Sequence, residues 1–283
     1  MTNPLIAARD AFAAAHPEAR EVIHGREWGV VDTGGAGPVL VLIPGTLGRG
    51  DIFWQQIAAL SPELRVIAVT YPATGGVADW ADDLDALCAA RGLGPVAVLG
   101  SSLGGFVAQY LAGTCPDRVG HLFAANTLHS VEGVATRQPY ASDLHHGPIE
   151  TLREGFGTGL RAWAQAHPDQ ADLIELLLAE VGGRIPEPEL RRRLLGLKEG
   201  PVLPPCPLPP DRVTTIQSDD DPLIPPQMRD AVRARVAPGA AFRFLWGGHF
   251  PYVTRPDAYV ALIRERMGLA PRTGWTNGAE PQA

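Results

Sequence analysis

The chain has 283 residues, of which 45% are hydrophobic, and it carries a formal net charge of −7 at pH 7. A chain of this composition packs a sizeable core, so global disorder is excluded, and the acidic balance without a basic stripe argues against nucleic-acid binding. The three cysteines, Cys88, Cys115 and Cys206, have neither metal-ligand spacing nor a disulfide pattern, which favours a reducing compartment.

The first residues lack the basic and apolar segments of a secretory signal, and no apolar run is long enough to span a membrane. We therefore expect a soluble cytoplasmic protein. Residues 5–15 have the pattern of a short amphipathic helix, and residues 21–31 have the pattern of strands that open the domain.

Strand and helix patterns alternate from there to residue 125. The β-type apolar runs are Val39–Ile43, Arg65–Val69, Pro95–Leu99 and Val119–Ala125. A helix is expected to begin with Asp79 as its N-cap, because apolar residues then recur at helical spacing. This alternation predicts a parallel sheet with helices on both faces.

The alternation stops after residue 126. Residues 130–210 show helical patterns, for example over 171–181 and 188–197, and end in a proline-rich connector at 204–210. The basic run Arg191–Arg193 is expected to be a solvated helix face. The alternation then resumes with a strand at 212–217, a helix at 226–236, a strand at 241–246 and a helix at 256–267. We predict one α/β core, residues 1–129 and 211–270, with a helical cap insertion at 130–210 and a flexible tail at 271–283.

The most specific motif is Gly-x-Ser-x-Gly at residues 100–104, between a β-type run and a helix-like run. This arrangement is typical of a nucleophile elbow, a sharp turn that leaves Ser102 exposed at its apex. Gly100 and Gly104 fit such a turn because a side chain there would meet neighbouring backbone. The alternative is a glycine-rich connection with an incidental serine.

An activated serine needs a base, and the base needs an acid that orients it. In elbow-type folds the order along the chain is serine, acid, histidine, each after a later strand. Asp221 and His249 follow the next two strands in that order.

Asp219 or Asp220 could take the place of Asp221, although Pro222 and the apolar pair after it favour Asp221. Asn126, at the end of its strand, is an alternative orienting group. His249 could also be a loop histidine with no chemical role.

An oxyanion hole needs two N–H groups near the serine oxygen. The first candidate is the backbone N–H of Leu103, directly after the nucleophile. The second is that of Thr46, in the loop Pro44–Gly48 that follows the first apolar strand.

Together, the serine elbow, the acid turn at Asp221–Pro225 and the histidine loop at Gly248–Phe250 resemble the α/β-hydrolase superfamily, over nearly the whole chain. The resemblance implies an eight-stranded, mostly parallel sheet with a helical cap after the sixth strand. Residues 100–106, 71–72 and 247–252 further resemble maspardin and its bacterial relatives.

Two positions depart from the superfamily pattern. The chain has Pro44-Gly45 where many members have His-Gly, which bears on how the oxyanion loop is anchored. It also has Thr70-Tyr71-Pro72 where many members have an Asp-x-Arg-Gly turn.

These features predict a serine hydrolase, most simply a carboxylic-ester hydrolase acting through an acyl-enzyme on a small or medium apolar ester. No cofactor and no metal is required. The alternatives are a non-catalytic, maspardin-like adaptor that binds proteins, and a hydrolase of carbon–carbon bonds with the same triad. Leu160, Trp163, Leu173 and Leu177 could line an acyl pocket, but packing of the cap on the core is the expected role. The substrate and the oligomeric state stay open.

Overall fold

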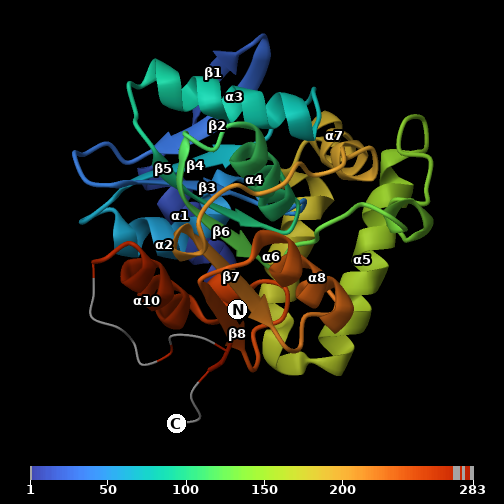
Figure 1. Ribbon diagram of the computed structural model, residues 1–283. Helices are drawn as coiled ribbons and strands as arrows, with labels where there is room; N and C mark the ends of the chain where they lie inside the picture. Colours follow the sequence, from blue (N-terminus) through green and yellow to red (C-terminus); the bar gives the residue numbers. More distant parts are fainter. Residues whose placement is uncertain (1, 270–274, 276–277, 281–283) are drawn as a thin grey trace.

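The computed structural model describes residues 2–269, 275 and 278–280. Its described residues form one nine-stranded sheet with the order β1-β2-β4-β3-β5-β6-β7-β8-β9 (Figure 1). Strand β2 pairs antiparallel with β1 and β4, and all other pairings are parallel. The predicted α/β-hydrolase fold is thereby confirmed, with one strand more than the eight expected. The strands are β1 (Ala19–Ile23), β2 (Arg26–Asp32), β3 (Val39–Ile43), β4 (Arg65–Thr70), β5 (Val96–Ser101), β6 (Val119–Ala125), β7 (Val213–Ser218), β8 (Ala240–Phe244) and β9 (Gly278–Ala279).

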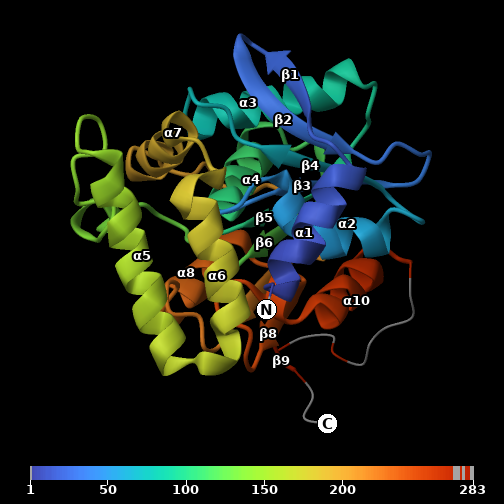
Figure 2. The ribbon, with the colours of Figure 1, turned by 180° about the vertical axis from the view of Figure 1, so that it is seen from behind.

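Helices cover both faces of the sheet, with α1, α2 and α10 on one face and α3, α4 and α8 on the other (Figure 2). The core helices are α1 (Pro4–Ala15), α2 (Trp54–Leu60), α3 (Val77–Ala90), α4 (Leu103–Thr114), α8 (Pro226–Val236), α9 (Pro251–Thr254) and α10 (Pro256–Arg266). Along β3, Leu40 and Leu42 join one hydrophobic cluster while Val41 and Ile43 join the other. Both sides of the strand are buried, which is why the sequence reads there as an unbroken apolar run.

Three α-helices lie between β6 and β7, gathered at one side of the molecule (Figures 1 and 2). They are α5 (Ile149–Ala166), α6 (Ala171–Ala179) and α7 (Glu187–Lys198), with a π-helical turn at Glu180–Arg184 after α6. The sequence indicated α6 and α7 but not α5. Gly155, Gly157 and Gly159 interrupt α5 and weaken its helical signature.

The first helix of the chain is tied to this insertion. Asn3 donates from its side-chain amide to the carbonyl of Asp172 and to Glu175 Oε2, both at 2.9 Å. Arg9 Nη1 lies 2.6 Å from Glu180 Oε1, and both side chains are almost fully buried. Helix α1 therefore joins the core to α6 and the turn that follows it.

The expectation that Asp79 is the N-cap of its helix was wrong. Helix α3 begins at Val77 with Gly76 as its N-cap, and Asp79 is the third helical residue. Asp79 Oδ2 instead accepts the backbone N–H of Gly76 at 3.0 Å, which is the second half of a capping box.

The predicted flexible tail, 271–283, lies mostly outside the described residues. Within it, Trp275 is 5% exposed and packs edge-on against Phe242 and Phe244. Strand β9 pairs with β8, so the prediction of a loose tail is wrong at these positions. The large apolar surface of the tryptophan favours its burial against the sheet.

Among the helices that the structure describes, none is both long enough and apolar enough to cross a membrane.

Candidate active site

Ser102 occupies a strained turn between β5 and α4, with φ 55° and ψ −119°. A serine in this region of backbone space costs roughly 1–3 kcal/mol, so its surroundings must hold it there. Its N–H donates to the Ala125 carbonyl at 3.0 Å, and its own carbonyl accepts from Phe106 N–H at 3.1 Å and Thr127 Oγ1 at 2.7 Å. The predicted sharp turn at Ser102 is therefore present and anchored on both sides.

The two glycines of the motif allow strand and helix backbones to touch. A Cβ added at Gly100 would lie 2.0 Å from the Gly104 carbonyl oxygen, and one at Gly104 would lie 2.1 Å from that of Ile43. Neither position has room for a methyl group, because the obstacle is backbone and not a flexible side chain.

His249 and Asp221 are in direct contact. His249 Nδ1 lies 3.0 Å from Asp221 Oδ1 and 2.9 Å from Oδ2, and the two residues are 5% and 8% exposed. Asp221 Oδ1 also accepts the backbone N–H groups of Leu223 and Ile224, at 2.8 and 3.1 Å. Burial acts to raise the pKa of Asp221, but His249 and these hydrogen bonds outweigh it and hold the pKa below its usual value.

Asp219 and Asp220, the alternatives to Asp221 that the sequence offered, bind other partners. Asp220 accepts the backbone N–H groups of Gly247 and Gly248, at 3.1 and 2.9 Å, which holds the loop that carries His249. Asp219 lies 3.1 Å from Arg243 Nε at the surface. The carboxylate in contact with the imidazole is thus that of Asp221.

Asn126 bonds to the acid and not to the imidazole. Its Nδ2 donates to Asp221 Oδ2 at 2.9 Å and to the Gly248 carbonyl at 3.3 Å. Its backbone has a φ of 41°, a left-handed conformation that asparagine tolerates better than most residues.

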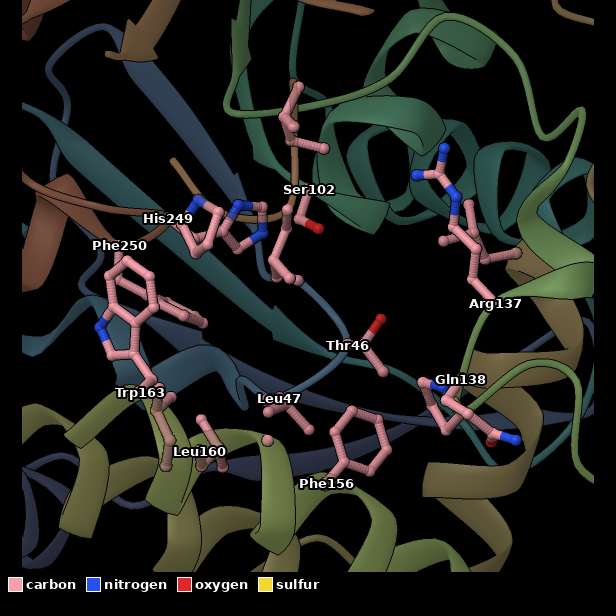
Figure 3. A pocket seen from close by; sticks show the side chains of 18 of the residues that line it. Thr46, Leu47, Ser102, Arg137, Gln138, Phe156, Leu160, Trp163, His249 and Phe250 are labelled. Carbon is pink, nitrogen blue, oxygen red and sulfur yellow. The ribbon is translucent and has the colours of Figure 1, made fainter. Parts of the chain in front are cut away.

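A cavity of about 520 Å³ joins Ser102 and His249 to the insertion. Figure 3 shows these two residues along one side of it, with Phe156 and Leu160 of α5 across from them. Ser102 and His249, both within the described part of the chain, line this cavity but are not hydrogen-bonded to each other. Because Nδ1 faces Asp221, Nε2 is the imidazole nitrogen that remains for a partner.

The cavity is mainly apolar. Its lining includes Leu160, Trp163, Leu173 and Leu177, four residues that were expected from the sequence to pack the cap on the core. Leu173 and Leu177 also belong to the hydrophobic core, so these two residues both line the cavity and pack the insertion on the core. Among the polar lining residues that the sequence did not indicate, Arg137 and Gln138 lie toward the end away from His249 (Figure 3). Gln170 lies near the loop that carries His249, with its Oε1 3.7 Å from the position of a Cβ added at Gly248.

The loop Pro44–Gly48 passes close to the serine. A Cβ at Gly45 would lie 3.1 Å from Ser102 Cβ, so only a glycine fits there without displacement. The backbone N–H groups of Thr46 and Leu103 have no hydrogen-bond partner within the described part of the chain.

Two side chains anchor this loop in place of the histidine that many superfamily members have. Tyr71 donates its hydroxyl to the Pro44 carbonyl at 3.0 Å. Arg193, from α7, donates from Nη1 to the carbonyls of Thr46 and Gly48, at 3.2 and 2.7 Å. The expectation that Arg191–Arg193 is a solvated face is thus wrong for Arg193, which is 0% exposed. The helical spacing that turns Leu190, Leu194 and Leu197 inward also turns Arg193 inward.

No group of three or more His, Cys, Asp or Glu side chains that could hold a metal ion occurs in the described residues.

The chain matches known proteins over most of its length. The sequence pattern of the alpha/beta hydrolase family matches residues 40–262. The lipase LipV of Mycobacterium tuberculosis is 32% identical over 83% of this chain and 95% of its own length. The putative carbamate hydrolase RutD of Caulobacter segnis is 30% identical over 79% of this chain and 89% of its own. A hydrolase structure from Pseudomonas aeruginosa superposes with a TM-score of 0.74 at 21% identity, covering 89% of this chain and 98% of that one.

Proposed function

This chain belongs to the alpha/beta hydrolase family, and we propose that within it the protein is a serine hydrolase that cleaves carboxylic esters through an acyl-enzyme. Ser102 Oγ attacks the ester carbonyl carbon while its proton passes to His249 Nε2. The bond to the alcohol oxygen then breaks, and the leaving alkoxide takes the proton from the imidazolium. Water, deprotonated by the same imidazole, releases the acid and regenerates Ser102.

The observation that carries this proposal is a strained, anchored serine in the same cavity as an imidazole held by a buried carboxylate. Asp221 keeps the proton of His249 on Nδ1 and stabilises the imidazolium that forms. The lowered pKa of Asp221 fits this role, because the carboxylate stays ionised at neutral pH. Hydrogen bonds to a catalytic serine are often long before substrate arrives, so their absence here is compatible with the relay.

The tetrahedral intermediate places a negative charge on the former carbonyl oxygen. We assign its stabilisation to the backbone N–H groups of Leu103 and Thr46, the two donors beside Ser102 that lack a partner. The start of α4 adds the favourable end of its helix dipole at the same point. Loss of one such donor typically costs about 3 kcal/mol of transition-state stabilisation.

The cavity lining favours an ester with an apolar chain. The two relatives described above are named as a lipase and a putative carbamate hydrolase. A carbamate is small and polar, and it would leave most of a 520 Å³ apolar cavity unfilled. An acyl or alkyl chain of medium length would bury its surface against α5 and α6, the helices of the proposed cap.

A fluorophosphonate probe tests the assignment of the nucleophile. We expect it to label the wild type at Ser102, as located by peptide mass spectrometry, and to leave Ser102→Ala unlabelled. Ser61→Ala, the same change at an exposed position, is the matched control and should label fully. Hydrolysis of p-nitrophenyl esters should be lost in the same variant.

Other outcomes lead to the alternatives. A folded wild type that takes no label would contradict the enzyme and favour a non-catalytic binding module. Full labelling without turnover of any p-nitrophenyl ester from two to twelve carbons would contradict ester hydrolysis and favour cleavage of carbon–carbon bonds.

A further inference from the structure

Arg193 is a buried cation whose donors converge on one loop. Its side chain is fully buried, and its guanidinium lies 5.4 Å from the centre of the Tyr71 ring. Its charge is balanced within its own helix by Glu189, whose Oε2 lies 3.0 Å from Nη2. A buried guanidinium is costly unless its surroundings satisfy it, so a site built in this way suggests a defined task.

Arg193 is linked to the Gly45–Thr46 peptide through Gly48, because the two carbonyls that it binds belong to the neighbouring peptides of the loop. Nη1 holds the Gly48 carbonyl at 2.7 Å, and the Gly48 N–H donates to the Gly45 carbonyl at 3.1 Å. In a planar trans peptide, the Gly45 carbonyl and the Thr46 N–H point in opposite directions. Fixing the carbonyl of Gly45 therefore fixes the direction of the N–H of Thr46.

The carbonyls on either side of the Gly45–Thr46 peptide are also bound by side chains. Arg193 also binds the Thr46 carbonyl at 3.2 Å, and Tyr71 binds the Pro44 carbonyl at 3.0 Å. Tyr140, from the insertion, lines the cavity together with Thr46. Of the two side chains that bind the loop, Arg193 comes from the segment between β6 and β7.

We propose that Arg193 is a positioning residue for the oxyanion hole, through which helix α7 of the insertion sets the direction of the Thr46 N–H. This inference rests on the proposed ester hydrolysis. Arg193 does not touch the substrate; it acts through the loop Pro44–Gly48. The insertion thus contributes to the rate of the chemical step as well as to the walls of the cavity.

The test compares three variants on helix α7. Arg193→Lys keeps the charge that balances Glu189 but loses the planar fork that spans two carbonyls. The double variant Arg193→Met with Glu189→Met removes both buried charges, so no carboxylate is left unpaired if the lysine variant fails to fold. Arg192→Met is the matched control, because Arg192 pairs with Glu199 near the surface and does not touch the loop.

Three measurements are made on each purified variant. Titration with a fluorophosphonate gives the concentration of competent Ser102. The hydrolysis of a p-nitrophenyl ester then gives kcat per competent site and KM. Inhibition by an alkyl boronic acid, which forms a tetrahedral adduct with serine, reports on stabilisation of the oxyanion.

We expect kcat per competent site to fall 10- to 100-fold in both Arg193 variants, with KM within threefold of wild type. The inhibition constant of the boronic acid should rise by the factor by which kcat/KM falls, and Arg192→Met should match wild type. An unchanged kcat per competent site, with only a lower melting temperature, would overturn the inference and leave Arg193 a structural residue. A wild type without labelling at Ser102 would instead overturn the proposed function and this inference with it.

Discussion

Asn126 and His249 share one oxygen of the buried acid: Asp221 Oδ2 lies 2.9 Å from Asn126 Nδ2 and 2.9 Å from His249 Nδ1. The amide thus stabilises the same charge that orients the imidazole. Asn126 has a left-handed backbone conformation, with φ 41°, and its N–H donates to the Ile216 carbonyl at 2.8 Å.

Asn126→Asp is expected to move the acidic limb of the pH profile of kcat/KM to higher pH. A second carboxylate beside Asp221 repels its negative charge, so the pKa of Asp221 rises and the ionised form is lost at a higher pH. Activity at pH 6 should fall about tenfold relative to wild type, with a smaller loss at pH 8. Asn126→Gly tolerates the positive φ and removes only the amide, so its shift should be smaller and in the same direction. An acidic limb unchanged in both variants would contradict the role given to Asn126.

Gly159→Leu is expected to shorten the preferred ester chain. Gly159 lines the cavity from α5, and an added Cβ there meets nothing within 4 Å, so the new side chain occupies open space. We expect kcat/KM for p-nitrophenyl decanoate to fall at least tenfold while that for the acetate stays within twofold. Stability should rise by up to about 1 kcal/mol from improved helix propensity.

Gly157→Ala is the matched control for this change on the same helix. Its Cβ would meet the flexible end of Arg161, 2.9 Å from Nη2, and Gly157 does not line the cavity. It should therefore keep the wild-type chain-length profile. Equal losses for acetate and decanoate in Gly159→Leu would argue against a chain-binding role for this part of the cavity.

Gly104→Ala is expected to destabilise the fold by about 3 kcal/mol. Its Cβ would lie 2.1 Å from the Ile43 carbonyl oxygen and 2.6 Å from that of Pro44, and neither backbone atom can move aside cheaply. Gly94→Ala, where the added Cβ meets nothing within 4 Å, should change the stability by less than 0.5 kcal/mol in either direction. Urea unfolding at pH 7 gives both values. A Gly104→Ala variant as stable as Gly94→Ala would mean that the elbow is looser than described.

His121 is expected to make the fold less stable in mild acid. Burial, with help from Arg266 and Arg212, lowers its pKa from 6.5 to about 4. The contribution of His121 to the free energy of unfolding is therefore complete above pH 6.5 and is lost as the pH falls toward 4. The loss occurs because the histidine of the unfolded chain takes up its proton at a higher pH than that of the folded chain. Between pH 7 and pH 4.5 this loss amounts to about 2 kcal/mol.

The measurement is urea unfolding at pH 7 and pH 4.5 for wild type and His121→Gln. Glutamine does not titrate and can still bond to Thr214 Oγ1, which lies 2.8 Å from His121 Nε2. The variant should lose about 2 kcal/mol less than wild type over this interval. Parallel losses in the two proteins would show that His121 does not sense the pH.

The sequence predicted the central strands, the serine elbow and the order of acid and base, because each depends on local patterns. Val39–Ile43 coincides with β3, since a strand buried on both faces has an unmistakable apolar run. The catalytic roles of Ser102, Asp221 and His249 stay predictions, as does the closer resemblance to maspardin-like proteins.

Arg193 and helix α5 could not be predicted because their roles depend on tertiary contacts. An arginine within a basic run is typically solvated, and nothing local shows that a loop 145 residues earlier supplies acceptors for it. Helix α5 contains glycines that disfavour a helix in isolation, so packing around the cavity must stabilise it.

The ion pair between Arg9 and Glu180 ties helix α1 to the turn after α6, and α6 forms one wall of the cavity. Leu173 and Leu177, which line that wall, are on α6, the helix to which Asn3 is bonded. Helix α1 is thus bonded to the helix that forms this wall of the cavity. If the proposed ester hydrolysis holds, a substitution that removes the Arg9–Glu180 pair is expected to alter the preference for ester chain length through the position of α6.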